Sequence, residues 1–577
     1  MFKSKTPLSG VNKTCQNCNI KFTIEPEDFE FYKKVDVPAP TFCPGCRMIR
    51  RFNWRNERKL FKKTDDLTKK EIFSIFSSKA DVKIYESDFW YSDKWDPMEY
   101  GQEYNFNKPF FKQLEELMKK VPWPSRAVEG LVNSDYCMNA SFLKNCYLIA
   151  RGFHSEDSSY GVILSYSKDS YDNYRIIKSE LCYEGFALEN CYKTFFSSHC
   201  VDCQEVYFSK NLVNCQNCFG CTNLKHKKYY IFNEQYAKKE YEEKIKEFNL
   251  GSYQSTIDLD KKTKELHLKY PNKFIHGSKN VNVVGDDIYN SKNIKDSYSI
   301  KDGEDLRYCQ FLDFENTQDC YDYSVLGINT RLIYESLGCG RGLNNVKFSF
   351  HCFPDCRELE YCLNCGSSSN LFACVGLRHK QYCILNKQYT KKEYEELVPK
   401  IKDHMNNMPY TDKKGRIYKY GEFFPPELSP FGYNETIANE YFPLTKEEAI
   451  KQGYNWYNKP KSEYKPTIKA SDLPDKIKDV DDSILKEVIA CDSNNCAGSN
   501  VFRIIPQELK FYQKMNLPLP HLCPDCRHRE RIKQRNPLKL WKRQCMKEGC
   551  SNEFQTTYAP ERKEIVYCER CYNREVG

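Results

Sequence analysis

The sequence predicts a mainly β, multidomain protein. Its centre is expected to be a tandem of parallel β-solenoid blocks, each closed by a capping helix, and both ends are expected to carry small four-cysteine zinc modules. Three observations lead to this prediction. Twelve of the 30 cysteines lie near the termini in three groups, and each group consists of two closely spaced pairs. A short signal, Cys or Ser beside Tyr, recurs through the middle of the chain without a helical period. One 23-residue stretch of that middle region occurs twice.

Length and composition narrow the class of protein. A chain of 577 residues is long enough for about three to five domains. It contains no run of about 18 apolar residues, so no segment is expected to span a membrane. The N-terminus lacks the apolar core of a signal peptide, which predicts a cytoplasmic protein. In such a reducing compartment, closely spaced cysteine pairs predict metal ligands rather than disulfides.

The terminal cysteines predict three structural Zn²⁺ sites. Zinc prefers four soft ligands in a tetrahedron, and two close pairs on separate turns supply them. Because all four positions are filled, the sites are expected to be structural rather than catalytic. The predicted ligands are Cys15, Cys18, Cys43 and Cys46 in the first site, Cys491, Cys496, Cys523 and Cys526 in the second, and Cys545, Cys550, Cys568 and Cys571 in the third.

The first and second modules contain copies of one segment. "FYKKVDVPAPTFCPGCRMIRRFNWRN" (31–56) and "FYQKMNLPLPHLCPDCRHRERIKQRN" (511–536) share 12 of 26 positions. The knuckle, hairpin and helix that this pattern predicts resemble a treble-clef or zinc-ribbon finger. The first copy is similar to a small bacterial "probable zinc-ribbon" family. The second copy departs from that family in its wider first cysteine pair.

A stripe of arginines follows the second cysteine pair in both copies. Residues four apart share one face of a helix, and the two stripes are Arg47, Arg51 and Arg55, and Arg527, Arg531 and Arg535. Their guanidiniums suit a phosphate backbone, so they are candidate contacts to nucleic acid or to another partner. The alternatives are a solvated face or pairing with acids on a neighbouring domain. The net charge of +9 is concentrated here, because 47–63 and 527–543 each hold eight Lys or Arg and one acid.

The segment 64–95 has the sequence frame of a zinc module without its ligands. When "VYCERCY" (566–572) is aligned with "IYESDFW" (84–90), Cys568 falls on Glu86 and Cys571 on Phe89. Upstream, Cys550 falls on Thr68. We therefore predict a degenerate, metal-free module stabilised by aromatic packing. Chance similarity remains the alternative, because the alignment is short.

The middle region predicts two solenoid blocks. Its Cys or Ser signal recurs at steps of 9 to 13 residues, and two steps predict a coil of about 21 to 24 residues. "CTNLKHKKYYIFNEQYAKKEYEE" (221–243) matches "CVGLRHKQYCILNKQYTKKEYEE" (374–396) at an offset of 153. In each copy a Lys/Glu-rich helical stretch follows, which would protect the open edge of a solenoid.

Eighteen further cysteines lie in this middle region. We interpret them as reduced, buried side chains that act as small hydrophobic residues in ladders. Additional metal sites and a redox role remain as alternatives. Segments such as "CVDC" (200–203), "CQNCFGC" (215–221) and "CLNC" (362–365) have the spacing of metal ligands.

The predicted domains follow the chain. They are zinc module 1 (1–63), a degenerate metal-free module (64–95), an aromatic helical connector (96–132), solenoid block 1 (133–236), a capping helix and linker (237–270), solenoid block 2 (271–389), a capping helix (390–407), a connector (408–480), zinc module 2 (481–543) and zinc module 3 (544–577).

The whole order resembles that of large uncharacterised cysteine-rich proteins of candidate-phyla (Patescibacteria-like) bacteria. "SPFGYNETIANEYFPLTKEEAIKQGYNW" and "WYSDKWDPMEYGQEY" look typical of that group, and the resemblance implies no activity. The residues favour a non-enzymatic zinc-binding scaffold with a protein or nucleic-acid partner. The alternatives are a solenoid enzyme acting on a polysaccharide and a thiol or metal store.

Overall fold

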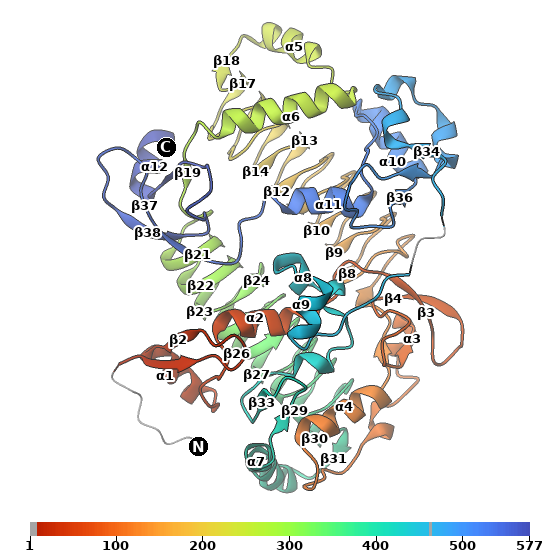
Figure 1. Cartoon of the computed structure of the whole chain (residues 1–577), viewed down its shortest axis with the longest axis vertical. Helices are drawn as coiled ribbons and strands as arrows, with labels where there is room; N and C mark the ends of the chain where they lie inside the picture. Colours follow the sequence, from red (N-terminus) through yellow and green to blue (C-terminus); the bar gives the residue numbers. More distant parts are fainter. Residues whose placement is uncertain (1–8, 461–463) are drawn as a thin grey trace.

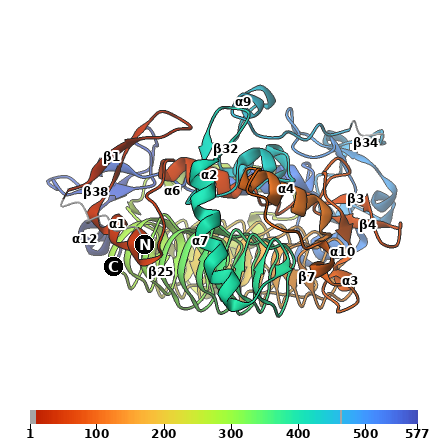
Figure 2. The ribbon, with the colours of Figure 1, turned by 90° about the horizontal axis from the view of Figure 1, so that it is seen from below.

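A computed structural model of the chain describes residues 9–460 and 464–577. It is mainly β, with two parallel β-solenoid blocks as one layer and the terminal modules and connectors along one side of that layer (Figures 1 and 2). This confirms the predicted fold class. The predicted ranges 1–63 and 408–480 include residues 1–8 and 461–463, which lie outside the described part of the chain.

The predicted coil of 21 to 24 residues is wrong, because one coil takes only 12 residues in block 1. Val162 pairs with Tyr174, Tyr174 with Phe186, and Phe186 with Ser198, all in parallel. Coils of block 2 take 11 to 14 residues, and the longest step joins Gly303 to Thr317. The 9- to 13-residue steps of the recurring signal therefore span from about three sides of a coil to a full coil, rather than half of one.

The short coil is possible because the chain turns at every third residue. From Asn139 to Asn217 every third residue has a positive φ near 50–60°, so a coil has four corners joined by short sides. Asn and Asp tolerate this left-handed conformation better than other residues that carry a side chain. Equivalent corner side chains also bond to one another, as Asn133 does to Asn145 (3.0 Å) and Asn145 to Asp157 (3.0 Å).

The residue that follows each corner points into the coil, where serine, cysteine and aliphatic side chains such as Ile176 and Val206 are buried. Serines there satisfy the backbone, because Ser179 Oγ accepts from Cys191 N (3.1 Å) and donates to the carbonyl of Ile177 (2.9 Å). Cysteines donate in the same way, as Cys191 Sγ does to the carbonyl of Cys200 (3.3 Å). Cysteine and serine are therefore interchangeable parts of the same ladders.

Block 1 contains two parallel sheets. Its strands are β7 (Val128–Glu129), β8 (Ala140–Ser141), β9 (Ala150–Phe153), β10 (Val162–Ser165), β11 (Tyr174–Ile177), β12 (Phe186–Glu189), β13 (Tyr192–Phe195), β14 (Ser198–Val201), β15 (Gln204–Tyr207), β16 (Gln216–Phe219), β17 (Lys228–Ile231) and β18 (Glu234–Gln235).

Block 2 forms one long sheet. Its strands are β20 (Gly277–Ser278), β21 (Val281–Tyr289), β22 (Lys292–Lys301), β23 (Gly303–Arg307), β24 (Gln310–Leu312), β25 (Thr317–Ser324), β26 (Thr330–Leu337), β27 (Asn344–Lys347), β28 (Arg357–Glu360), β29 (Ser369–Phe372), β30 (Gln381–Ile384) and β31 (Lys387–Gln388). The coils of the two blocks follow one another in opposite directions. Arg151 of block 1 contacts Asp313 of block 2, whereas Arg175, two coils further along block 1, contacts Asp287, which lies earlier in block 2.

Helices follow the last coil of each block, as predicted. Block 1 is followed by α5 (Lys238–Glu247) and α6 (Tyr253–His267), and Phe248 stacks on Phe219 of the last coils (4.2 Å). Block 2 is followed by α7 (Lys391–Asn407), which begins with a capping box between Thr390 and Glu393.

The terminal modules and connectors lie over the blocks. Their strands are β1 (Val11–Thr14), β2 (Lys21–Ile24), β3 (Phe61–Thr64), β4 (Glu71–Ser74), β5 (Ile84–Tyr85), β6 (Trp123–Pro124), β19 (Asn272–Lys273), β32 (Tyr410–Thr411), β33 (Ile417–Tyr418), β34 (Ile468–Lys469), β35 (Ile489–Ala490), β36 (Val501–Phe502), β37 (Trp541–Gln544), β38 (Glu553–Thr556) and β39 (Val566–Tyr567). Their helices are α1 (Pro26–Lys34), α2 (Pro44–Phe52), α3 (Ser87–Trp90), α4 (Phe110–Lys120), α8 (Ile437–Tyr441), α9 (Lys446–Lys451), α10 (Pro506–Met515), α11 (Pro524–Ile532) and α12 (Glu569–Val576).

Candidate metal centres and the docking of their helices

Each terminal cysteine cluster joins a turn to the start of a helix. In the first module, Cys15 and Cys18 lie in the turn between β1 and β2, and Cys43 is the N-cap of α2. Cys523 and Cys568 are the N-caps of α11 and α12 in the other two modules. A metal held by one cluster would therefore fix a turn and a helix start in one position.

The sulfur geometry suits a tetrahedral metal. In each cluster the four Sγ atoms lie within 4.8 Å of one another. Individual separations are 3.7 Å for Cys18–Cys43, 3.5 Å for Cys496–Cys523 and 4.0 Å for Cys550–Cys568. A tetrahedron with Zn–S bonds of about 2.3 Å has S–S edges of roughly 3.8 Å. The twelve predicted ligands thus come together as three sets of four.

Backbone amides point at the sulfurs. The N–H of Cys523 donates to Cys491 Sγ (3.2 Å), that of Ala497 to Cys526 Sγ (3.3 Å), and that of Cys568 to Cys545 Sγ (3.3 Å). Hydrogen bonds to a charged form stabilise that form, so these donors favour the thiolates that metal binding requires.

The segment predicted as a metal-free module has the hairpin of the zinc modules. β3 pairs with β4 in the same register as β1 pairs with β2. Asp65 follows β3 at the position where Cys15 follows β1. Asp65 accepts a hydrogen bond from the N–H of Thr68 (2.9 Å). Glu86 is the N-cap of α3 and accepts from Asp88 N (2.9 Å). The bond between Asp65 and Thr68 therefore connects two positions that cysteines occupy in module 3.

Both arginine stripes are buried against the solenoid. The exposed fraction is 0–1% for Arg47, Arg51 and Arg531, 4% for Arg527 and 6% for Arg55. The Arg535 side chain is 12% exposed. A phosphate could reach these guanidiniums only if the helices left the blocks. The burial of the six arginines supports the alternative in which they pair with acids of the same chain.

The first stripe docks on block 2. Arg47 Nε donates to Asp322 (2.9 Å), and Arg51 Nη1 contacts Asp322 (3.0 Å) and Glu335 (3.2 Å). Arg50, next to the stripe, bridges Glu335 and Glu422 (2.9 Å) of the connector. Burial raises the pKa of Glu335, and Arg50 partly offsets the increase. Buried charges are tolerable only when paired, and here each carboxylate has a guanidinium partner.

The second stripe docks on block 1 in the same way. Arg527 contacts Asp172 (3.1 Å) and Glu508 (3.0 Å), and Arg531 contacts Asp172 (3.0 Å) and Glu184 (2.7 Å). Burial raises the pKa of the Glu184 carboxyl to about 7, despite the nearby Arg531 guanidinium.

The third arginine of each stripe does not reach the docking acids. Arg55 pairs with Glu57 (2.6 Å) and contacts His351 (2.8 Å). Arg535 pairs with Glu440 of the connector (2.9 Å) and lies over the ring of Tyr441 (3.9 Å). These contacts tie the end of each docked helix to its surroundings.

The acids that receive the stripes were not predicted from the sequence. Asp172 and Glu184 are separated by exactly one coil, as are Asp322 and Glu335. An acid repeated at the coil period could have signalled them, but only with the correct coil length.

The 18 solenoid cysteines are all buried and free of disulfides. Burial raises the pKa of Cys182 to about 12, which keeps its thiol neutral. In residues 9–460 and 464–577, the sets of three or more ligand atoms that converge on one point are the three terminal clusters. The cysteines of 200–203, 215–221 and 362–365 form no such set, although some of their thiols contact one another, as Cys200 and Cys203 do.

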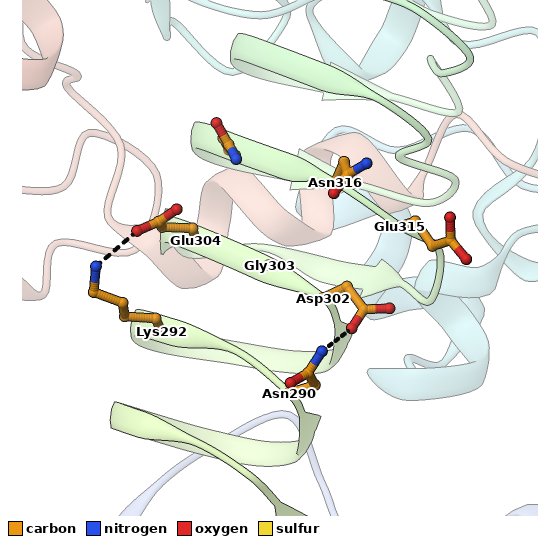
Figure 3. Close-up of a pocket in the computed structure, with 8 residues that line it drawn as sticks. Asn290, Lys292, Asp302, Gly303, Glu304, Glu315 and Asn316 are labelled. Carbon is orange, nitrogen blue, oxygen red and sulfur yellow. Dashed lines mark hydrogen bonds and ion pairs between the residues drawn. The ribbon is translucent and has the colours of Figure 1, made fainter.

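A shallow polar depression of about 380 Å³ lies on the outer corners of block 2 (Figure 3). Lys292 pairs with Glu304 (2.9 Å), and Asn290 bonds to Asp302, in each case across one coil. Glu315 lies in the same depression. Two of its three carboxylates are thus already engaged by the neighbouring coil.

A smaller cavity of about 70 Å³ lies between the blocks, beneath the segment 534–538. His199 and His276 stack within it (4.4 Å), and His276 Nδ1 faces Asp286 (3.1 Å). Burial lowers the pKa of His199 well below its usual value, so this imidazole is neutral.

No family model matches the chain, and no curated protein does. In the described part of the chain, every helix is too short or too polar to cross a membrane.

Proposed function

We propose that the protein is a non-enzymatic scaffold in which three Zn²⁺ ions hold the terminal modules in place on two solenoid blocks. The observation that carries the proposal is the position of the clusters. Two of the three four-cysteine sets sit at the N-terminus of a helix whose arginines enter a solenoid block. Loss of the metal would free the start of that helix, and buried arginines would lose the alignment with their acids.

The expected partner is a protein that binds the solenoid faces not covered by the modules. The arginines of both stripes pair with acids of the same chain, so they do not favour nucleic acid as the partner. A filter-binding assay with RNA and DNA at low salt is expected to show no binding. Salt-dependent binding would return nucleic acid to consideration. Membership of the cysteine-rich bacterial family stays a prediction.

Metal analysis of the purified full-length chain tests the proposal. We expect three zinc ions per chain, one for each cluster. A chelator should then make 11–56 and 489–536 sensitive to protease while the amides of the solenoid strands stay protected from hydrogen exchange. Cys43→Ser should reduce the metal content by one equivalent. Cys191→Ser, a matched change inside a coil, should leave the count at three.

Other outcomes would overturn the proposal in distinguishable ways. Iron in place of zinc, or a count well above three, would favour the thiol or metal store. Unchanged protease resistance after complete metal removal would show that the metals do not hold the modules.

A further inference from the structure

The two docking interfaces are copies of each other. Phe31 stacks on Tyr321 (3.9 Å) and Phe511 on Tyr171 (4.2 Å). The next pairs are Tyr32 with Tyr334 (5.5 Å) and Tyr512 with Tyr183 (5.7 Å). Arg47 lies over Tyr308 (5.2 Å) and Arg527 over Tyr160 (4.7 Å). On the modules these partners are 480 residues apart, and on the blocks they are 148 to 151 apart.

The two docking interfaces connect the ends of the chain to the blocks in crossed order. We call 11–95 arm 1 and 489–577 arm 2. The first module of arm 1 docks on block 2, and the first module of arm 2 docks on block 1. The second module of each arm pairs instead with the strand that leads into the other block, since β5 pairs with β6 and β39 with β19. Each arm therefore bridges both blocks (Figure 1).

This arrangement is that of a two-fold dimer whose halves have exchanged arms and are joined into one chain. Docking depends on side-chain recognition between segments about 270–290 residues apart, so the identity of the chain that supplies the arm is not specified by the contact. Residues 96–127, with α4, connect arm 1 to block 1 and form the segment along which arm 1 would cross to the other copy.

We propose that the arm 1 docking surface of block 2 also accepts arm 1 of a second copy of this chain, giving a closed dimer with exchanged arms. This surface comprises Tyr308, Tyr321, Asp322, Tyr334 and Glu335. Reciprocal exchange uses the same surface on both copies, so the assembly closes at two chains. In one chain the tethered arm has the advantage of a high effective concentration, which favours the monomer when both partners are intact.

A charge difference assigns each arm to its own block. Arg50 of arm 1 reaches Glu335 and Glu422, and the equivalent residue of arm 2 is Glu530. If arm 2 occupied the block 2 surface, Glu530 would face these two carboxylates. Like charges at a buried contact oppose binding. The exchange therefore keeps arm 1 with block 2.

Two full-length variants test the proposal by complementation. Arg47→Glu with Arg51→Glu disables arm 1 but leaves the block 2 surface intact. Asp322→Lys with Glu335→Lys disables that surface but leaves arm 1 intact. In a mixture, each intact element finds its partner only on the other chain. We expect a 1:1 dimer by native mass spectrometry, with an apparent Kd at least ten-fold lower than for self-association of either variant.

The control combines all four substitutions in one chain. Its reversed charges are complementary in cis, so it should stay monomeric. A mixture that remains two monomers would overturn the proposal.

A second measurement guards against variants that fold poorly. Unlabelled and ¹⁵N-labelled wild-type chains, undocked together with chelator and mild urea and then returned to zinc buffer, should yield mainly monomers and a minor fraction of dimers that contain one chain of each kind. Recovery of monomers alone would overturn the proposal independently of the variants. The docking residues are not metal ligands, so this outcome leaves the zinc sites undecided.

Discussion

The two docking surfaces share their geometry but not their charge balance. On block 2, four guanidiniums face four carboxylates, namely Arg47, Arg50, Arg51 and Arg307 against Asp28, Asp322, Glu335 and Glu422. On block 1, two guanidiniums face three carboxylates, namely Arg527 and Arg531 against Asp172, Glu184 and Glu508. Aromatic stacking is the same on both.

The difference separates the contacts that both surfaces share from those that only the block 2 surface makes. Ring stacking and the two central arginines position both arms, so they suffice for docking. Arg50 and Glu422 are additions that only the block 2 surface carries. The surface on block 1 has one carboxylate more than it has guanidiniums, so protonation of one carboxyl would balance it. The Glu184 carboxyl, whose pKa rises to about 7, is that group.

The largest expected effect comes from removing a central arginine. Arg51→Ala would leave Asp322 and Glu335 buried with fewer partners, and Arg531→Ala would do the same to Asp172 and Glu184. Removal of one partner from a buried ion pair costs about 3–5 kcal/mol. Urea unfolding and protease release of the arms measure the loss.

Arg331→Ala is the matched control. Its side chain is 56% exposed and pairs with Asp319 on the surface, where ion pairs contribute about 0–1 kcal/mol. A loss below 1 kcal/mol for Arg531→Ala would contradict the picture of a buried ion cluster on block 1.

The pH dependence should separate the two surfaces. Glu184 holds a proton in the folded state up to about pH 7, whereas in the unfolded chain it loses the proton near pH 4.5. Its contribution to stability is complete below about pH 4.5 and is lost as the pH rises through about 7, an effect of about 3 kcal/mol. Glu184→Gln should remove this dependence and stabilise arm 2 at pH 8.

Urea unfolding of wild type and Glu184→Gln at pH 5, 6, 7 and 8 measures the effect. Glu530→Gln, a change at an exposed site, serves as the control. Parallel curves for wild type and Glu184→Gln at every pH would show that the excess charge is neutralised in another way.

The four-cysteine clusters and the duplicated blocks could be predicted from the sequence, but the coil and the docking could not. Cys43 and Cys46 define half a site through local spacing alone, and the repeat at an offset of 153 locates the blocks directly. The coil length was missed because corner positions accept residues such as Tyr160 and Ile163 in the left-handed conformation. Composition therefore does not reveal the turn at every third residue.

The role of the arginines was open for a different reason. Arg47 and Asp322 are 275 residues apart, and no local pattern relates them. The same stripe that suits a phosphate backbone also suits two carboxylates one coil apart. Only the folded arrangement separates these two interpretations, because it decides which side of the helix faces solvent.

The smallest expected effect tests whether Arg50 is an addition specific to block 2. Glu530, its counterpart, is exposed and pairs only with Lys533 three residues on (2.6 Å) in the described contacts. Glu530→Arg removes a helix-surface pair worth about 0.2–0.5 kcal/mol, and no acid equivalent to Glu422 gains a partner. We expect a change within about 0.5 kcal/mol by urea unfolding. Arg50→Glu, by contrast, would bury a third acid beside Glu335 and Glu422 and should release arm 1 to protease. If Glu530→Arg instead stabilised arm 2 by more than 1 kcal/mol, the new guanidinium would have reached Glu184, the counterpart of Glu335, and the two surfaces would be more alike than their ion pairs indicate.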